Sequence, residues 1–98
     1  MSRAVIVRPD SEAKLTETFR WYERQFPGLG STFLLSIDAT IQSIRRTPQL
    51  YPIVHKEVHG DVVRRFLFGV FYLIEQQRIV ILAVFHARRD PRFWQSRA

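Results

Sequence analysis

The chain has 98 residues, which is enough for one domain over residues 1–98 and too few for a second hydrophobic core. It contains no cysteine, which excludes disulfides and thiolate metal sites and is typical of proteins from a reducing compartment. The 15 Lys and Arg residues outnumber the 9 Asp and Glu residues, and this net charge of +6, mostly from arginine, predicts an acidic partner or nucleic acid.

No part of the sequence has the pattern of a targeting segment, a membrane span or a metal site. The first residues lack the long apolar run of a signal peptide, and no later run is long enough to cross a bilayer. His55, His59 and His86 do not have the spacing of metal ligands. We therefore expect a cytoplasmic protein that uses neither a metal nor a cofactor and does not enter the membrane.

The first expected elements are a strand and a helix. Ala4–Val7 is rich in β-branched residues and is followed by Pro9, which predicts a short strand. Asp10 or Ser11 should then cap a helix. The apolar residues that recur along this helix at a period of three or four are Leu15, Phe19, Tyr22 and Phe26. For Trp21 and Tyr22 we expect packing in the core, and residues 27–30 should end the helix.

A second helix is expected from about Ser31 to Thr47. Its predicted buried stripe consists of Leu34, Ile37, Ile41 and Ile44, while Asp38, Gln42 and Arg45 face outward. Thr47 precedes Pro48, and a residue before proline avoids the helical conformation, so the helix should stop there. The two helices are then expected to form an antiparallel hairpin.

The second half of the chain has the pattern of strands. We expect strands over Val58–Val63, over residues 68–75 and over Arg78–His86, the last two joined by a two-residue loop, Gln76-Gln77. The order β-α-α-β-β-β predicts an α+β domain, in which an antiparallel helix hairpin packs on one face of a mostly antiparallel sheet. A short C-terminal tail follows.

The two-residue loop predicts which residues of the last two strands lie opposite each other. The expected pairs are Glu75 with Arg78, Leu73 with Val80, Phe71 with Leu82, Gly69 with Val84, and Leu67 with His86. Because side chains alternate between faces, His86 should share a face with Phe71 and lie away from Tyr72. A β-bulge would overturn this assignment.

Both faces of the expected sheet are apolar, yet the two helices can cover only one of them. The other face is either an exposed surface that needs a partner, or it is covered by the tail through Phe93 and Trp94. The sequence leaves both alternatives open.

Six motifs in register make the chain resemble the ParE/RelE toxin superfamily, the toxic halves of bacterial type II toxin–antitoxin (plasmid stabilisation) modules. They are Trp21-Tyr22-Glu23, Pro27-Gly28-Leu29-Gly30, Phe33-Leu34, Pro48-x-x-Tyr51-Pro52, Gly69-Val70-Phe71-Tyr72 and Ala83-Val84-Phe85-His86-x-Arg88-Arg89-Asp90-Pro91. The resemblance covers nearly the whole chain. It implies a growth-inhibiting toxin whose helices and sheet are wrapped by a cognate antitoxin.

The resemblance leaves two targets open. ParE-like members of the superfamily bind and poison DNA gyrase, whereas RelE-like members cut messenger RNA in the ribosome. Two segments depart from the family pattern: Val58-His59-Gly60 replaces a Val-Arg-Arg, and Phe66-Leu67-Phe68 replaces a Phe-Pro-Tyr. The nuclease branch typically has an arginine three residues before the strand tyrosine, where this chain has Gly69. These missing charges favour a non-enzymatic gyrase inhibitor.

The candidate site residues fall into two groups. The expected target-binding residues are Arg64, Arg65, His86, Arg88, Arg89, Arg92 and Trp94, and the expected antitoxin-binding residues are Phe71, Leu73, Val80, Leu82 and Val84. If the chain is a ribosome-dependent nuclease instead, His86 would move the proton and Arg88 or Arg89 would hold the phosphate, with Glu57 as the candidate carboxylate. A third alternative is a degenerate, non-toxic member that still binds its antitoxin.

Overall fold

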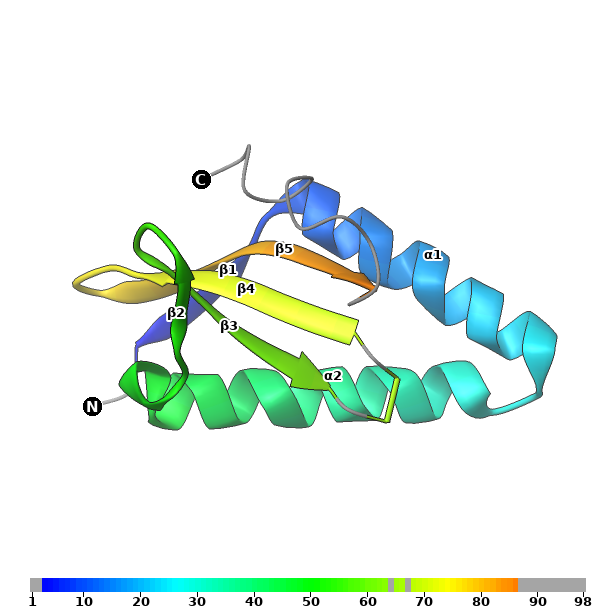
Figure 1. Ribbon diagram of the computed structural model, residues 1–98. Coiled ribbons are helices and arrows are strands. Elements are labelled where there is room, and N and C mark those ends of the chain that lie inside the picture. The colour runs from blue at the N-terminus through cyan, green and yellow to red at the C-terminus, as the bar shows by residue number, and fades with distance from the viewer. Residues whose placement is uncertain (1–2, 64, 67, 87–98) are drawn as a thin grey trace.

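In the part of the chain that the structure describes, two α-helices pack on one face of a five-stranded sheet (Figure 1). The computed structural model describes residues 3–63, 65–66 and 68–86, and for 61, 62, 85 and 86 it describes the backbone. The elements in chain order are β1 (Ala4–Val7), α1 (Pro9–Gln25), α2 (Leu29–Arg46), the 3-10 turn η1 (Pro48–Leu50), β2 (Ile53–His55), β3 (Val58–Val63), β4 (Phe68–Ile74) and β5 (Arg78–His86).

The order of strands across the sheet is β1-β5-β4-β3-β2. β1 runs parallel to β5, and each of the other neighbouring pairs is antiparallel. The expected α+β architecture, with a helix hairpin on one face of a mostly antiparallel sheet, is therefore confirmed. The short strand β2 is an addition, because the sequence pattern did not separate it from β3.

The first helix begins earlier than expected. Pro9 occupies its first turn and Arg8 is the N-cap residue, so the expected N-cap at Asp10 or Ser11 is wrong. Proline suits the first helical position because its fixed φ is already helical and it has no N–H to leave unpaired. The Asp10 carboxylate accepts the Ser11 N–H at 2.9 Å inside the first turn.

The turn between the helices depends on a close backbone approach at Gly30. A Cβ atom built on Gly30 would lie 2.5 Å from the Phe19 carbonyl oxygen and 2.6 Å from Cγ of Glu23. The Glu23 carboxylate in turn accepts the N–H groups of Gly28 and Ser31, both at 3.2 Å, and so caps the start of α2 from the neighbouring helix. For this reason α2 begins at Leu29 and not near Ser31.

The helices and the sheet enclose one main core. Along α2 the fully buried apolar residues are Phe33, Ile37 and Ile44, while Ile41 is partly buried. Leu34 is 38% exposed, so the expectation that it belongs to the buried stripe is wrong. Phe33 takes its place: it precedes Ile37 by four residues where Leu34 precedes it by three, and both spacings lie on the same side of a helix.

The turn between β4 and β5 has the expected two-residue loop. The Glu75 N–H donates to the Arg78 carbonyl at 2.8 Å, and Leu73 lies opposite Val80. The Arg78 side chain returns to the Glu75 carboxylate, with Nε 2.5 Å from Oε1. These contacts confirm the first two of the expected pairs.

A β-bulge then changes the pairing of the two strands. Tyr72 lies opposite Ile81, but Phe71 lies opposite Ala83, so Leu82 is an extra residue in β5. Leu82 and Ala83 both belong to the apolar cluster on the face opposite the helices. Because of this extra residue, every later residue of β5 lies on the opposite face of the sheet from the one that an uninterrupted register predicts.

The bulge makes three expected pairs wrong: Phe71 with Leu82, Gly69 with Val84, and Leu67 with His86. Phe68 lies opposite His86 instead. Val84 is 3% exposed and packs with Tyr72 in the core under the helices, not with Phe71. The expectation that His86 shares a face with Phe71 rested on the same register and loses its support.

We predict that Gly30→Ala destabilises the domain by about 1–3 kcal/mol, because the added Cβ meets a backbone carbonyl that cannot move without separating the helices. Chemical denaturation followed by circular dichroism measures the change. Ser31→Ala, one residue further on and exposed, is the control and should change stability by less than about 0.5 kcal/mol. Equal stability of Gly30→Ala and the parent chain would contradict the close packing at this position.

Candidate functional site

The expected target-binding residues cluster at one end of the sheet as far as the structure describes them. Arg65 lies in the turn between β3 and β4, and His86 is the last residue of β5. Both belong to the same end, because Phe68 is paired with Val63 of β3 and with His86 of β5. We call this the basic end of the sheet. The other expected target-binding residues lie outside the described residues: Arg64, Arg88, Arg89, Arg92 and Trp94.

Arg65 is held at the surface by an aromatic ring. Its side chain is exposed, and its guanidinium carbon lies 5.5 Å from the ring centroid of Phe66, which is within the range of a cation–π contact. The Phe66 ring is itself buried, so it offers Arg65 a rigid support. The guanidinium of Arg65 is therefore exposed to solvent while the buried Phe66 ring restricts its position.

An aromatic cluster joins the basic end to α1. Phe66 lies 5.1 Å from Tyr22 and 5.3 Å from Phe33 between ring centroids. Partial burial raises the pKa of the Tyr22 hydroxyl above its ordinary value, which keeps it neutral. Trp21 contacts Tyr22 edge-on at 5.0 Å but is 50% exposed. Core packing is thus confirmed for Tyr22 and wrong for Trp21.

The strand tyrosine, Tyr72, is a structural residue. Its side chain is fully buried, and its hydroxyl donates to the Pro48 carbonyl at 2.5 Å. This bond ties β4 to η1 and closes the core beneath the end of α2. A hydroxyl in this position is not accessible to a substrate.

His59 belongs to the same structural group. Its ring stacks on Tyr72 at 5.3 Å with an interplanar angle of 18°. Its Nδ1 lies 2.7 Å from the Tyr51 carbonyl, and since a carbonyl can only accept, Nδ1 carries the proton. The Tyr51 hydroxyl is 2.6 Å from Oγ of Ser43 on α2. His59, Tyr51 and Tyr72 therefore fasten the segment after α2 to the sheet.

Gly69 and Gly60 both lie against the ring of Phe71. A Cβ built on Gly69 would lie 2.6 Å from a Phe71 ring carbon, and one built on Gly60 would lie 2.7 Å from another. Neither glycine can therefore be replaced by an arginine without displacing the ring. The Phe71 ring thus occupies the space that a side chain at position 60 or 69 would need.

Glu57 is far from the basic end. It lies in the turn between β2 and β3, before Val58, whereas the basic end adjoins Val63 at the other end of β3. The expectation that Glu57 serves as a carboxylate near His86 is therefore wrong.

The face of the sheet opposite the helices carries a second apolar cluster. It consists of Val58, Phe71, Leu82 and Ala83, with Leu73 and Val80 partly exposed beside them. Four of the five expected antitoxin-binding residues share this face, and we call them the outer-face residues: Phe71, Leu73, Val80 and Leu82. Val84 does not belong to them, because the bulge places it under the helices.

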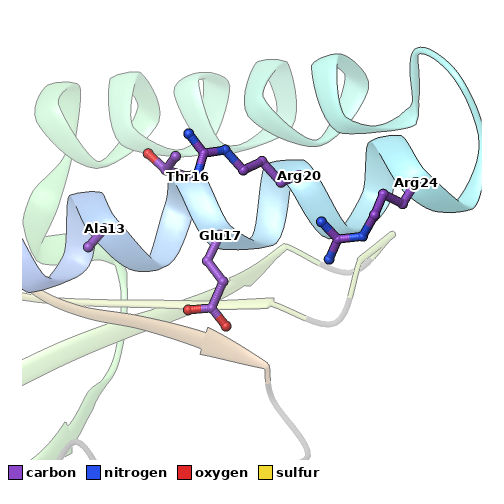
Figure 2. Close-up of a pocket in the computed structure, with 5 residues that line it drawn as sticks. All are labelled: Ala13, Thr16, Glu17, Arg20 and Arg24. Carbon is purple, nitrogen blue, oxygen red and sulfur yellow. The ribbon is translucent and has the colours of Figure 1, made fainter.

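A charged surface that the sequence interpretation missed lies on the outward side of α1. Arg20 and Arg24 line a shallow hollow there together with Ala13, Thr16 and Glu17 (Figure 2). The signal in the sequence was the spacing of the two arginines by four residues on the polar side of the helix.

No three His, Asp or Glu side chains in the described ranges come close enough to hold a metal ion. None of the helices that the structure describes is both long and apolar enough to cross a membrane.

Comparison with known proteins gives a family match and a shared fold. The sequence matches the family model described as the ParE toxin of the type II toxin–antitoxin system, parDE, over residues 5–91. No curated protein matches it. Among solved structures, a chain of the chromosomal ParDE toxin–antitoxin system from P. aeruginosa has 13% identity and a TM-score of 0.78, with 89% of this chain and 98% of that chain covered.

The isolated E. coli RelE toxin has a similar fold as well. The identity is 11% and the TM-score 0.67, with 97% of this chain and 95% of that chain covered. At such identities the two structures show the fold alone.

We predict that Tyr72→Phe lowers stability by about 1–3 kcal/mol, because the Pro48 carbonyl is left buried without its donor. Urea denaturation measures the loss. Tyr51→Phe is the matched variant and should cost less, since Tyr51 is only partly buried. A Tyr72→Phe protein as stable as the parent would contradict the structural role of this hydroxyl.

Proposed function

The chain belongs to the ParE toxin family of type II toxin–antitoxin systems, and we propose that it inhibits DNA gyrase by binding to it, without catalysing a reaction. Its expected membership of the ParE/RelE superfamily is confirmed by the family match, and both structural neighbours share its fold. We propose further that a cognate antitoxin neutralises it.

One observation supports a toxin that acts by binding. Cleavage of RNA by its own 2′-hydroxyl requires a base, an acid and a cation at the phosphate. Within the described residues, the Tyr72 hydroxyl donates to Pro48, and the position three residues before it lies beneath the Phe71 ring. Neither position can contact a phosphate, which favours the gyrase inhibitor over the nuclease.

We propose the basic end of the sheet as the surface that contacts gyrase. Arg65 is exposed there on its aromatic support, with His86 at the adjacent strand end. Arginine is among the residues that most often dominate a protein interface. The proposed contacts from the remaining sequence are Arg64, Arg88, Arg89, Arg92 and Trp94.

We propose the outer face as the antitoxin-binding surface. Leu73 and Val80 are partly exposed at its margin, beside the buried Phe71 and Leu82. The ring of Phe71 contacts two glycines, so no side chain at either glycine position separates it from the strands. The charge of +6 favours an acidic segment.

The alternative is a RelE-like nuclease that would use His86 with Arg88 or Arg89. The position of His86 at a strand end, directly before an arginine-rich segment of the sequence, is the observation that favours it. A non-toxic member that retains antitoxin binding is the remaining possibility. Assays of gyrase inhibition and of transcript cleavage distinguish the gyrase inhibitor, the nuclease and the non-toxic member.

We predict that the purified protein inhibits supercoiling by gyrase and that Arg65→Glu weakens the inhibition at least about tenfold, because it reverses a charge at the proposed contact. Titration of the protein against gyrase and relaxed plasmid measures the effect. Lys56→Glu makes the same charge change in the β2–β3 turn, at the far end of the sheet, and should leave the inhibition nearly unchanged.

Failure to inhibit gyrase, together with new transcript cuts in a translating extract, would overturn the gyrase proposal in favour of the nuclease. The nuclease alternative fails in its turn if His86→Ala combined with Arg89→Ala leaves growth inhibition intact. Absence of both activities would identify a non-toxic member.

We predict that Leu73→Glu weakens antitoxin binding at least about 30-fold, since it places a charge in an apolar contact of hot-spot size. The measurement is calorimetric titration with the cognate antitoxin. Leu35→Glu introduces the same charge on α2, where the side chain is 71% exposed, and should have little effect. Equal losses in the two variants would rule out the outer face as the specific surface.

A further inference from the structure

Arg20 and Arg24 stand one helical turn apart on the outward side of α1, where with Thr16 they line the hollow shown in Figure 2. We propose that this arginine surface, defined by Thr16, Arg20 and Arg24, binds the phosphate backbone of a nucleic acid. It is separate from the basic end and from the outer face, so the inference goes beyond the proposed function and does not depend on it.

The two guanidinium groups have no intramolecular partner within the described part of the chain. Neither arginine has a carboxylate within 4.0 Å or a hydrogen bond there, although other basic residues do. Lys14 pairs with Glu17 at 3.7 Å, and Arg3 donates to the Glu75 carbonyl at 3.1 Å. Like charges at a spacing of four residues repel each other weakly, and an anion bound between them relieves this repulsion.

The directions of the side chains favour an anion from outside. In Figure 2 the Arg20 side chain extends over Thr16, whereas the Glu17 carboxylate points to another side of the helix. The Glu17 charge is already matched by Lys14. The hollow between the arginines therefore presents positive charge to solvent.

The spacing suits successive phosphates. Four residues of α-helix advance by about 6 Å, so the two arginines can each bind one phosphate of the same strand through paired hydrogen bonds. Trp21 precedes Arg24 by three residues, a spacing at which side chains are neighbours on a helix, and it is 50% exposed with its ring edge-on to Tyr22. An indole fixed in this way can stack on a base of a single strand.

A nucleic acid fits this surface better than an acidic protein does. Ala13 is the one apolar residue among the described residues that line the hollow, so there is no apolar pocket for the anchor side chains of a protein partner. Binding of a phosphate backbone needs no such pocket, because release of counterions supplies most of the free energy.

The test is fluorescence anisotropy of labelled 20-mer DNA, single-stranded and duplex, titrated with the chain between about 50 and 200 mM salt. Arg20→Gln with Arg24→Gln should weaken duplex binding at least about tenfold at the lowest salt and reduce the slope of log K against log salt by about 2. Trp21→Ala should weaken single-strand binding more than duplex binding.

The matched control is Arg46→Gln with Lys56→Gln, which removes the same charge from exposed positions elsewhere. Circular dichroism should show both double variants folded, since all four side chains are exposed. Equal loss of binding in the two double variants would overturn the proposal, because net charge alone would then explain the affinity. Failure of the parent chain to bind either DNA, with binding of a poly-glutamate peptide that requires Arg20 and Arg24, would assign the surface to an acidic protein instead.

Discussion

The parallel pairing of β1 with β5 is the constraint on which the rest of the fold depends. Parallel neighbours cannot be joined by a tight turn, so the chain that leaves β1 has to cross the sheet before it can return to it. The Arg8 N–H donates to the Ile81 carbonyl at 3.3 Å, and α1 starts directly after this bond. The two helices make the crossing and cover one face of the sheet. The other face is left to the cluster around Phe71, and this face is the one to which we assign the antitoxin.

Most of the elements could be predicted from the sequence because their signals are local. Alternation of apolar and polar residues at helical spacing, the β-branched run before Pro9, and the Thr47-Pro48 stop each depend on a few neighbouring residues. The errors at the helices are small and have clear causes. Pro9 is the first residue of α1, and Phe33, four residues before Ile37, is buried where Leu34, three residues before Ile37, was expected. Both spacings are helical, so packing against the sheet decides which of the two adjacent apolar residues is buried, and the spacing alone does not contain that information.

The candidate site was harder to predict, because it depends on the bulge at Leu82. Nothing in the residues 81–84, which are all apolar, marks one of them as unpaired. The extra residue moved Val84 beneath the helices and removed the basis for placing His86 beside Phe71. The structure gives the motif residues Pro48 and Tyr51 a role. Their backbone carbonyls accept hydrogen bonds from the Tyr72 hydroxyl and from His59 Nδ1. The arginine surface was missed, since a pair of exposed arginines on a helix ordinarily means no more than solubility.

Because the two helices are closed by the contact at Gly30, the residues on their outward surfaces can change without loss of stability. The helices are held together by a backbone carbonyl of Phe19 against Gly30, and by the Glu23 carboxylate on the next turn. Outward residues such as Arg24 and Leu35 take no part in that closure. Substitutions among them are therefore nearly neutral for folding. A lineage can change what these surfaces recognise, one residue at a time, while the distance between the helices is inherited unchanged.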